Sequence, residues 1–124
     1  MNSRTEYPFE KLGVWQSARE LAKAVYTTAA FPRNEIYGLS SQSNRSAISV
    51  VANLAEGSSR RSRKDQAHYS EIAYGSLMEL ACLLILSSDI GILPTDSEKN
   101  LRSSIEQLSV QLNALHRSQR SRID

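Results

Sequence analysis

A short run of basic side chains stands out among the residues whose type and spacing could support chemistry. Four cationic residues lie within a stretch of five: Arg60, Arg61, Arg63 and Lys64. Clustered arginine and lysine side chains neutralise phosphates and release counterions, which gives salt-sensitive binding with little sequence preference. Stacking on a base would also need a nearby aromatic side chain, and Tyr69 is the one that the sequence places close. A solvated loop that keeps a protein soluble has the same composition, so both interpretations stay open.

A second set of polar residues is spaced by three on two expected helices: Asn53, Glu56, Ser76 and Glu79. Glu56 and Glu79 could form a carboxylate pair for acid–base chemistry. No histidine, cysteine or tyrosine is placed to converge with them. The sequence therefore favours a structural polar network that fixes helix register or caps the second helix.

The placement of histidine, cysteine and carboxylate residues indicates no catalytic or metal site. A di-iron site in a helical bundle needs two Glu-x-x-His pairs, whereas His68 and His116 each lack a glutamate three residues before them. Cys82, the single cysteine, lies in an apolar stretch and is expected to pack as a small core residue. We therefore expect no catalytic residue, metal ion, cofactor or small-molecule substrate, and no enzymatic activity.

The elements that must position these side chains are four helices. Apolar residues recur at helical spacing in four segments of the 124-residue chain, and no segment alternates in the manner of a strand. The expected helices cover approximately residues 12–30, 34–56, 63–90 and 96–118. The last one spaces its apolar residues by four and three in turn, a heptad pattern suited to bundle packing. The sequence therefore predicts an all-α fold in a single domain, 1–124.

Turn and cap residues set the expected ends of these helices. Phe31-Pro32 ends the first, because the residue before a proline avoids the helical region. Gly57 is expected to end the second in the left-handed conformation, and Gly91 followed by Pro94 to end the third. Two expected helix starts resemble capping boxes: Ser62 with Asp65, and Thr95-Asp96-Ser97-Glu98.

Short connections make successive helices antiparallel neighbours, which predicts an up-down-up-down four-helix bundle. In that topology the loop after the second helix and the C-terminal residues lie at one end. Positive charge is concentrated in these two places: the net charge is +4 over residues 57–64 and +2 over residues 117–124, but −5 over residues 65–116. We expect one basic pole that joins the run at 60–64 to three further arginines: Arg117, Arg120 and Arg122.

The third expected helix lacks a polar face over residues 80–86. A helix in a lone bundle normally keeps one face for water, so burial against another subunit is the favoured explanation, with Leu83 and Leu86 at the interface. The alternative is that another segment of the same chain covers this face. The apolar run has seven residues, against the roughly 20 needed to cross a bilayer, so no membrane span is expected.

Two features favour a cytoplasmic location. The first ten residues include charges and Pro8, but no apolar run typical of a secretory signal. The single cysteine fits a reducing compartment.

Five short motifs, taken in order, resemble one known family. They are Val14-Trp15-Gln16, Phe31-Pro32, Tyr37-Gly38-Leu39, Asn53-Leu54-Ala55-Glu56-Gly57 and Ala73-Tyr74-Gly75-Ser76-Leu77-Met78-Glu79-Leu80. From about Phe9 to Leu115 the chain is similar to the four helix bundle protein family, whose members include the 23S ribosomal RNA intervening-sequence proteins. Val50-Val51 departs from the pattern, because members often carry a proline there. The departure suggests an unbroken second helix.

The resemblance implies a cytosolic bacterial protein whose four-helix subunits assemble into a five-membered ring, a homopentamer. The activity of the family is largely undefined, and some members are encoded within intervening sequences of ribosomal RNA genes. A similar protein, the accessory variability determinant of diversity-generating retroelements, binds a reverse transcriptase and nucleic acid through basic surface. The basic residues after Gly57 match in character, Arg60 best.

Two functional hypotheses follow. The first is a non-enzymatic, self-assembling binding module whose basic pole engages RNA, DNA or a nucleic-acid-processing protein. The second is a structural or protein–protein interaction module without affinity for nucleic acid, in which the charge serves solubility.

Overall fold

The computed structural model describes residues 6–28 and 38–123, which form four α-helices preceded by one turn of 3-10 helix. The 3-10 turn, η1, covers Pro8–Lys11. The helices are α1 (Gly13–Tyr26), α2 (Leu39–Ser58), α3 (Arg63–Ile90) and α4 (Thr95–Arg120). These two described segments contain no strand, so the all-α prediction is confirmed.

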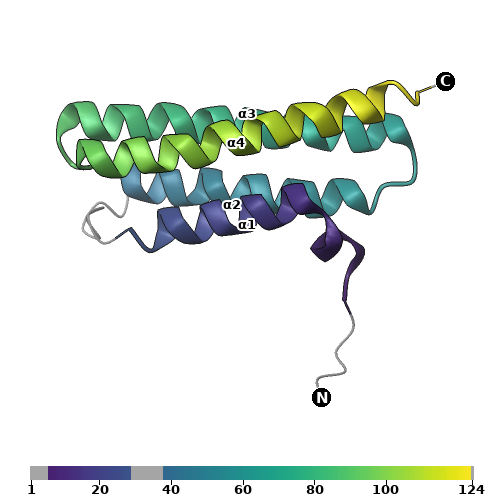
Figure 1. Ribbon diagram of the computed structural model, residues 1–124, viewed down its shortest axis with the longest axis horizontal. Helices are drawn as coiled ribbons and strands as arrows, with labels where there is room; N and C mark the ends of the chain where they lie inside the picture. Colours follow the sequence, from purple (N-terminus) through teal and green to yellow (C-terminus); the bar gives the residue numbers. More distant parts are fainter. Residues whose placement is uncertain (1–5, 29–37, 124) are drawn as a thin grey trace, which may run out of the picture.

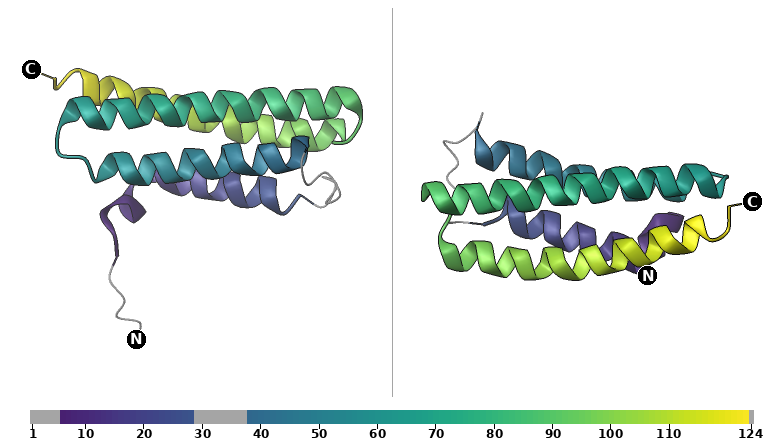
Figure 2. Two further views of the ribbon diagram at one scale, coloured as in Figure 1. Left: turned by 180° about the vertical axis from the view of Figure 1, so that it is seen from behind. Right: turned by 90° about the horizontal axis from the view of Figure 1, so that it is seen from above.

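Each helix packs on the next one along the chain, and α1 also contacts α4 to close the bundle. Figure 1 shows consecutive helices running in opposite directions, and the two views of Figure 2 show the same arrangement from behind and from above. The α2–α3 contact is the most extensive and the α1–α4 contact the least. The expected antiparallel order of the four helices is therefore the observed one.

The core is built from the apolar stripes that the sequence predicts. Leu77, Leu80 and Leu84 of α3 lie at its centre and are almost fully buried. Four of the five heptad positions of α4 are buried with them, Leu101, Ile105, Leu108 and Leu112, whereas the fifth, Leu115, is half-buried. Burying one such side chain contributes roughly 1.5–3 kcal/mol, so these stripes hold the four helices in register.

Helix α3 begins and ends where the sequence predicts. Ser62 Oγ accepts a hydrogen bond of 3.0 Å from the backbone N–H of Asp65 and so caps the first turn. Gly91 ends the helix with a φ of +92°, in the left-handed region that favours glycine.

Gly57 does not end α2, so that prediction is wrong. It lies inside the helix, which continues to Ser58, and among the described residues Gly91 alone has a positive φ. The physical reason for glycine here is a close helix contact. A Cβ added at Gly57 would lie 2.8 Å from Tyr69 Cβ on α3, so the absent side chain lets the two helices approach.

The start of α4 also differs from the prediction, because Thr95-Asp96-Ser97-Glu98 forms no capping box. Pro94 is the N-cap residue and Thr95 is already helical. Glu98, 6% exposed, accepts a hydrogen bond of 2.8 Å from Arg102 Nε. Its carboxylate is thus paired along the helix and does not reach back to the cap. The helix runs to Arg120, two residues beyond the expected end.

Helix α1 ends at Tyr26, earlier than residue 30. Thr27 Oγ1 donates to the carbonyl of Lys23 at 2.7 Å and Thr28 Oγ1 to that of Ala24 at 2.6 Å, which satisfies two carbonyls of the last turn. The expected breaker Phe31-Pro32 and the expected start of the second helix at Asn34 lie outside the described residues.

One described helix, α3, is long and apolar enough to cross a membrane by length and composition alone. Core helices of water-soluble bundles share this property. In this protein α3 packs against both α2 and α4, and its leucine stripe is buried between them.

Candidate nucleic-acid interface

The α2–α3 loop and the last turn of α4 lie at the same end of the bundle (Figure 1). Two contacts between α3 and α4 fix this arrangement. Ser70 Oγ donates a hydrogen bond of 2.7 Å to Gln119 Oε1, and Glu71 Oε1 lies 3.5 Å from His116 Nε2. The first two turns of α3 are therefore beside the last two turns of α4.

We call this end of the bundle the basic end, after its exposed cations. Six basic side chains are exposed there: Arg61, Arg63, Lys64, Arg117, Arg120 and Arg122. Three carboxylates are exposed at the same end: Asp65, Glu56, which pairs with Arg60, and Glu71, which contacts His116. The sequence positions that contribute cations are more than fifty residues apart, and the antiparallel packing of α3 and α4 makes them neighbours.

The two groups of cations relate differently to the helix dipoles. Arg117 and Arg120 lie in the last turn of α4, where positive charge stabilises the helix. Arg63 and Lys64 lie in the first turn of α3, where the dipole favours negative charge instead. Helix stability therefore does not account for the cations at the start of α3.

Arg60 differs from the other cations, because its guanidinium is paired with side chains of the same subunit. Its Nη2 donates to Glu56 Oε2 at 2.5 Å and to Tyr69 Oη at 2.8 Å. Tyr69 Oη in turn donates to Glu56 Oε2 at 3.1 Å. The hydrogen bond to Glu56, followed by the interaction with Tyr69, raises the pKa of Arg60 further above its ordinary value. This guanidinium joins α2 to α3 and is neutralised locally.

The polar residues expected to form one network belong to separate groups. Ser49 Oγ and Ser76 Oγ are 2.8 Å apart across the α2–α3 contact. Asn53 Nδ2 donates to the Ser49 carbonyl at 2.8 Å and to Ser49 Oγ at 3.1 Å. Glu56 contacts Arg60 and Tyr69, so a tyrosine does converge with this carboxylate, contrary to the prediction from the sequence. Ser49, which the sequence analysis did not single out, is the residue that connects Asn53 with Ser76.

Glu79 forms no hydrogen bond with the residues of either group, although it lies near Ser49. It lines a shallow groove of about 320 Å³ with four residues of α2: Gln42, Arg45, Ser46 and Ser49. Glu56 thus contacts Arg60 and Tyr69 whereas Glu79 lines this groove, so the two carboxylates have different surroundings.

A small pocket opens at the basic end between the ends of all four helices. Its volume is about 190 Å³. The polar residues that line it are Asn53, Ser58, Arg63, Gln66, Ser70 and Gln119. The remaining lining comes from Leu12, Leu54, Gly57 and Leu115. We call this space the end pocket.

Gln119 and Ser70 are buried polar residues beside the end pocket. Gln119 is 8% exposed and Ser70 is 3% exposed. Both occupy core positions, since Gln119 follows Leu115 by four and Ser70 precedes Ala73 by three. Neither residue was predicted as a site residue, although the continuation of the two apolar stripes places both at the core.

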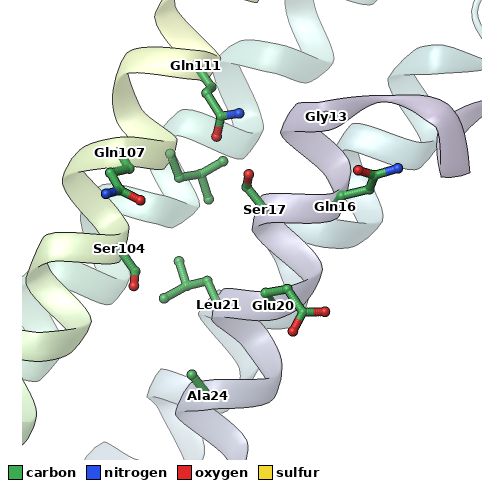
Figure 3. Close-up of a pocket in the computed structure, with 10 residues that line it drawn as sticks. Gly13, Gln16, Ser17, Glu20, Leu21, Ala24, Ser104, Gln107 and Gln111 are labelled. Carbon is green, nitrogen blue, oxygen red and sulfur yellow. The ribbon is translucent and has the colours of Figure 1, made fainter.

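A larger groove runs between α1 and α4, the pair of helices in least extensive contact. Its volume is about 650 Å³. Figure 3 shows Gln16, Ser17 and Glu20 of α1 on one side and Ser104, Gln107 and Gln111 of α4 on the other. No basic side chain lines it, so it is separate from the basic end.

The outer face of α3 carries exposed apolar side chains. Their exposed fractions range from 37% to 59%: Ile72, Met78, Ile85, Leu86 and Ile90. Leu86 is 43% exposed, whereas Leu83 is 9% exposed and packs within the subunit. Of the two residues expected at a subunit interface, only Leu86 thus offers much free surface, because Leu83 is buried within the subunit.

Cys82 also lies on this outer face and is exposed, so its expected place in the core is wrong. The helical period places it opposite the buried stripe of Leu77, Leu80 and Leu84. Among the residues that the structure describes, no three histidine, cysteine or carboxylate side chains gather closely enough to hold a metal ion.

Comparisons with known proteins give the following matches. The model of the 23S rRNA-intervening sequence protein family matches residues 10–114. A crystal structure of a protein with unknown function from the S23 ribosomal protein family of Bacteroides thetaiotaomicron VPI-5482 is similar to the chain, with a TM-score of 0.76 and 22% identity. The match covers 83% of this chain and 97% of the other, and it establishes the likeness of fold. No curated protein matches.

Proposed function

The chain belongs to the 23S rRNA-intervening sequence protein family, and on that premise we propose that it is a non-enzymatic, self-assembling module that binds nucleic acid through its basic end. The observation that carries the proposal is the gathering of six exposed cations from two distant parts of the sequence: Arg61, Arg63, Lys64, Arg117, Arg120 and Arg122.

The charges of the basic end fit phosphate binding better than a structural role. An exposed cation gains little from intramolecular pairing, and Arg63 and Lys64 lie where the α3 dipole opposes them. A polyanion that contacts these side chains releases its condensed counterions, which favours binding at low salt. Arg60 contributes to the shape of the loop, because its charge is held by Glu56 and Tyr69.

Self-assembly is the second part of the proposal. The exposed apolar face of α3 supports contact with a second copy of the chain, since burying it would gain roughly 25 cal/mol per Å² of apolar surface. The resemblance to the four helix bundle proteins implies a ring of five subunits. A ring would repeat the basic end and raise the effective affinity for a long polynucleotide. A cytoplasmic location, where RNA and DNA are accessible in bacteria, belongs to the same proposal.

Fluorescence anisotropy with labelled RNA and DNA tests the binding. We expect the affinity to fall steeply between about 50 and 200 mM salt, with a logarithmic slope of about −0.7 per phosphate contact on single strands. The triple substitution Arg61→Ser, Arg63→Ser and Lys64→Ser should remove most of the affinity and leave the helical circular dichroism unchanged.

A matched control removes the same charge elsewhere. Arg19, Lys23 and Lys99 are exposed cations on other parts of the bundle, and their joint change to serine should leave most of the affinity. Equal loss in both triple variants would mean that net charge, and not the basic end, attracts the polyanion. No binding at the lower salt would reject the proposal and favour a protein–protein interaction module.

A further inference from the structure

We propose that the end pocket receives a single unpaired base of the bound polynucleotide, while the surrounding cations hold the phosphates beside it. This inference rests on the proposed function and adds the class of nucleic acid, which is single-stranded or looped. Three observations carry it: the position of the pocket, the unused donors of Gln119 and the apolar lining.

The end pocket and the basic end share Arg63. This side chain lines the pocket and is itself exposed. Its Nη1 donates to Gln66 Oε1 at 3.1 Å, which holds the guanidinium at the rim and leaves its other N–H groups for a ligand. A strand whose phosphate contacts Arg63 would thus have its adjacent base next to the opening.

The amide of Gln119 provides hydrogen-bond donors inside. Its Oε1 accepts from Ser70 Oγ at 2.7 Å, whereas its Nε2 donates to no residue in 6–28 or 38–123. A leucine would continue the apolar stripe of α4 at this position, whereas the Gln119 amide lines the open pocket, where water or a ligand can reach its Nε2. A ligand that carries hydrogen-bond acceptors would use these N–H groups, and the ring nitrogens and carbonyls of bases are such acceptors.

The rest of the lining fits the faces of a base. Leu12, Leu54 and Leu115 give the pocket an apolar surface, and enzymes that extrude a base hold it between apolar or aromatic side chains while polar groups contact its edge. The volume of about 190 Å³ is below the roughly 300–1,000 Å³ of pockets for drug-sized ligands. It suits one ring system. A base stacked inside a duplex could not enter, so the pocket selects unpaired nucleotides.

Anisotropy on three RNAs of equal charge tests the inference: a single strand, a duplex with the same number of phosphates, and the single strand with abasic sites. We expect the ordinary strand to bind roughly tenfold more tightly than the abasic one, the size of effect that one well-held base gives. A 2-aminopurine in the strand should change its fluorescence on binding, because the base leaves its neighbours.

The substitution Gln119→Leu should remove the preference for the ordinary strand and keep the salt slope, because the cations remain. The substitution removes the acceptor of the 2.7 Å bond from Ser70 Oγ, which keeps its 3.3 Å bond to the Gln66 carbonyl. The melting temperature and helical circular dichroism of the variant are therefore measured as well, and a retained fold means that loss of the preference does not come from unfolding. Gln111→Leu, on an exposed position of the same helix, is the matched control and should keep the preference. If the abasic and ordinary strands bind equally, the inference is wrong and the proposed function stands. If no RNA binds, both are wrong.

Discussion

The guanidinium carbon of Arg60 lies 4.8 Å from the centre of the Tyr69 ring, so the first cation of the loop is held against α3. Its charge is also paired with Glu56. We expect Arg60→Ala to lower the urea midpoint of unfolding and to leave the salt slope of RNA binding unchanged. Arg61→Ala, at the exposed neighbour, should do the reverse and reduce the slope by about 0.7, the value for one phosphate contact on a single strand. A fall in slope for Arg60→Ala would show that this pairing breaks when RNA binds.

The two helical glycines of the α2–α3 pair should respond in opposite directions to alanine. An added Cβ at Gly57 would meet Tyr69 Cβ at 2.8 Å, whereas one at Gly75 would meet nothing within 4 Å. Gly57→Ala should therefore destabilise the fold by about 1–3 kcal/mol through overpacking. Gly75→Ala should stabilise it by about 1 kcal/mol through helix propensity. Urea unfolding of both variants measures this, and a destabilising Gly75→Ala would reveal a contact from another subunit.

The hydrogen bond between the Ser49 and Ser76 hydroxyls should couple the effects of substitutions at these two positions on stability. Changing either serine to alanine removes the 2.8 Å bond, although Ser49 Oγ still accepts a bond of 3.1 Å from Asn53 Nδ2. A double-mutant cycle cancels the gain in helix propensity and should give a coupling of about 0.5–1.5 kcal/mol. Ser49 combined with Ser104, an exposed serine of α4, is the control cycle. In the control cycle the two changes in the free energy of unfolding should be additive. If the changes for Ser49 and Ser76 are also additive, the hydrogen bond contributes nothing to stability.

A charge on the outer face of α3 should dissociate the proposed assembly. Leu86 is 43% exposed in the subunit, and Leu86→Glu would place a carboxylate in an apolar interface, where burial of an unpaired charge is costly. Native mass spectrometry should show monomers while the helicity is retained. Val110→Glu, at a 70% exposed position of α4, should leave the assembly intact. An unchanged oligomer in Leu86→Glu would place the interface elsewhere.

The helices themselves could be predicted from the sequence because their signals are local. The bounds of α3 follow from Ser62, whose hydroxyl caps the first turn, and from Gly91, whose positive φ ends the helix. The buried stripe of α4 follows from the spacing of its leucines, and Leu108 and Leu112 are 1% exposed as expected. Antiparallel packing of α2, α3 and α4 then follows from the short connections at 59–62 and 91–94, and it brings the two basic segments together.

The misjudged residues depend on a neighbouring helix, which no local pattern reports. Gly57 resembles a helix terminator in sequence, but the closeness of Tyr69 decides its role. Cys82 sits in an apolar run, yet the orientation of α3 leaves it exposed. Ser49 gains its importance from Ser76 on the facing helix. The end pocket needs residues from the ends of all four helices, so its position could not be derived from any one segment.

The contact between Ser70 on α3 and Gln119 on α4 has a consequence for protein synthesis. The two residues are 49 positions apart, and a ribosome adds roughly 5–20 residues per second. Synthesis of the residues between Ser70 and Gln119 therefore takes seconds. During this time the nascent chain contains the cations of the α2–α3 loop but not those at the end of α4. The full cationic surface, and the end pocket that Gln119 lines, arise only when the last turn of α4 docks. On the proposed function, incomplete chains would therefore bind polyanions less well than finished ones.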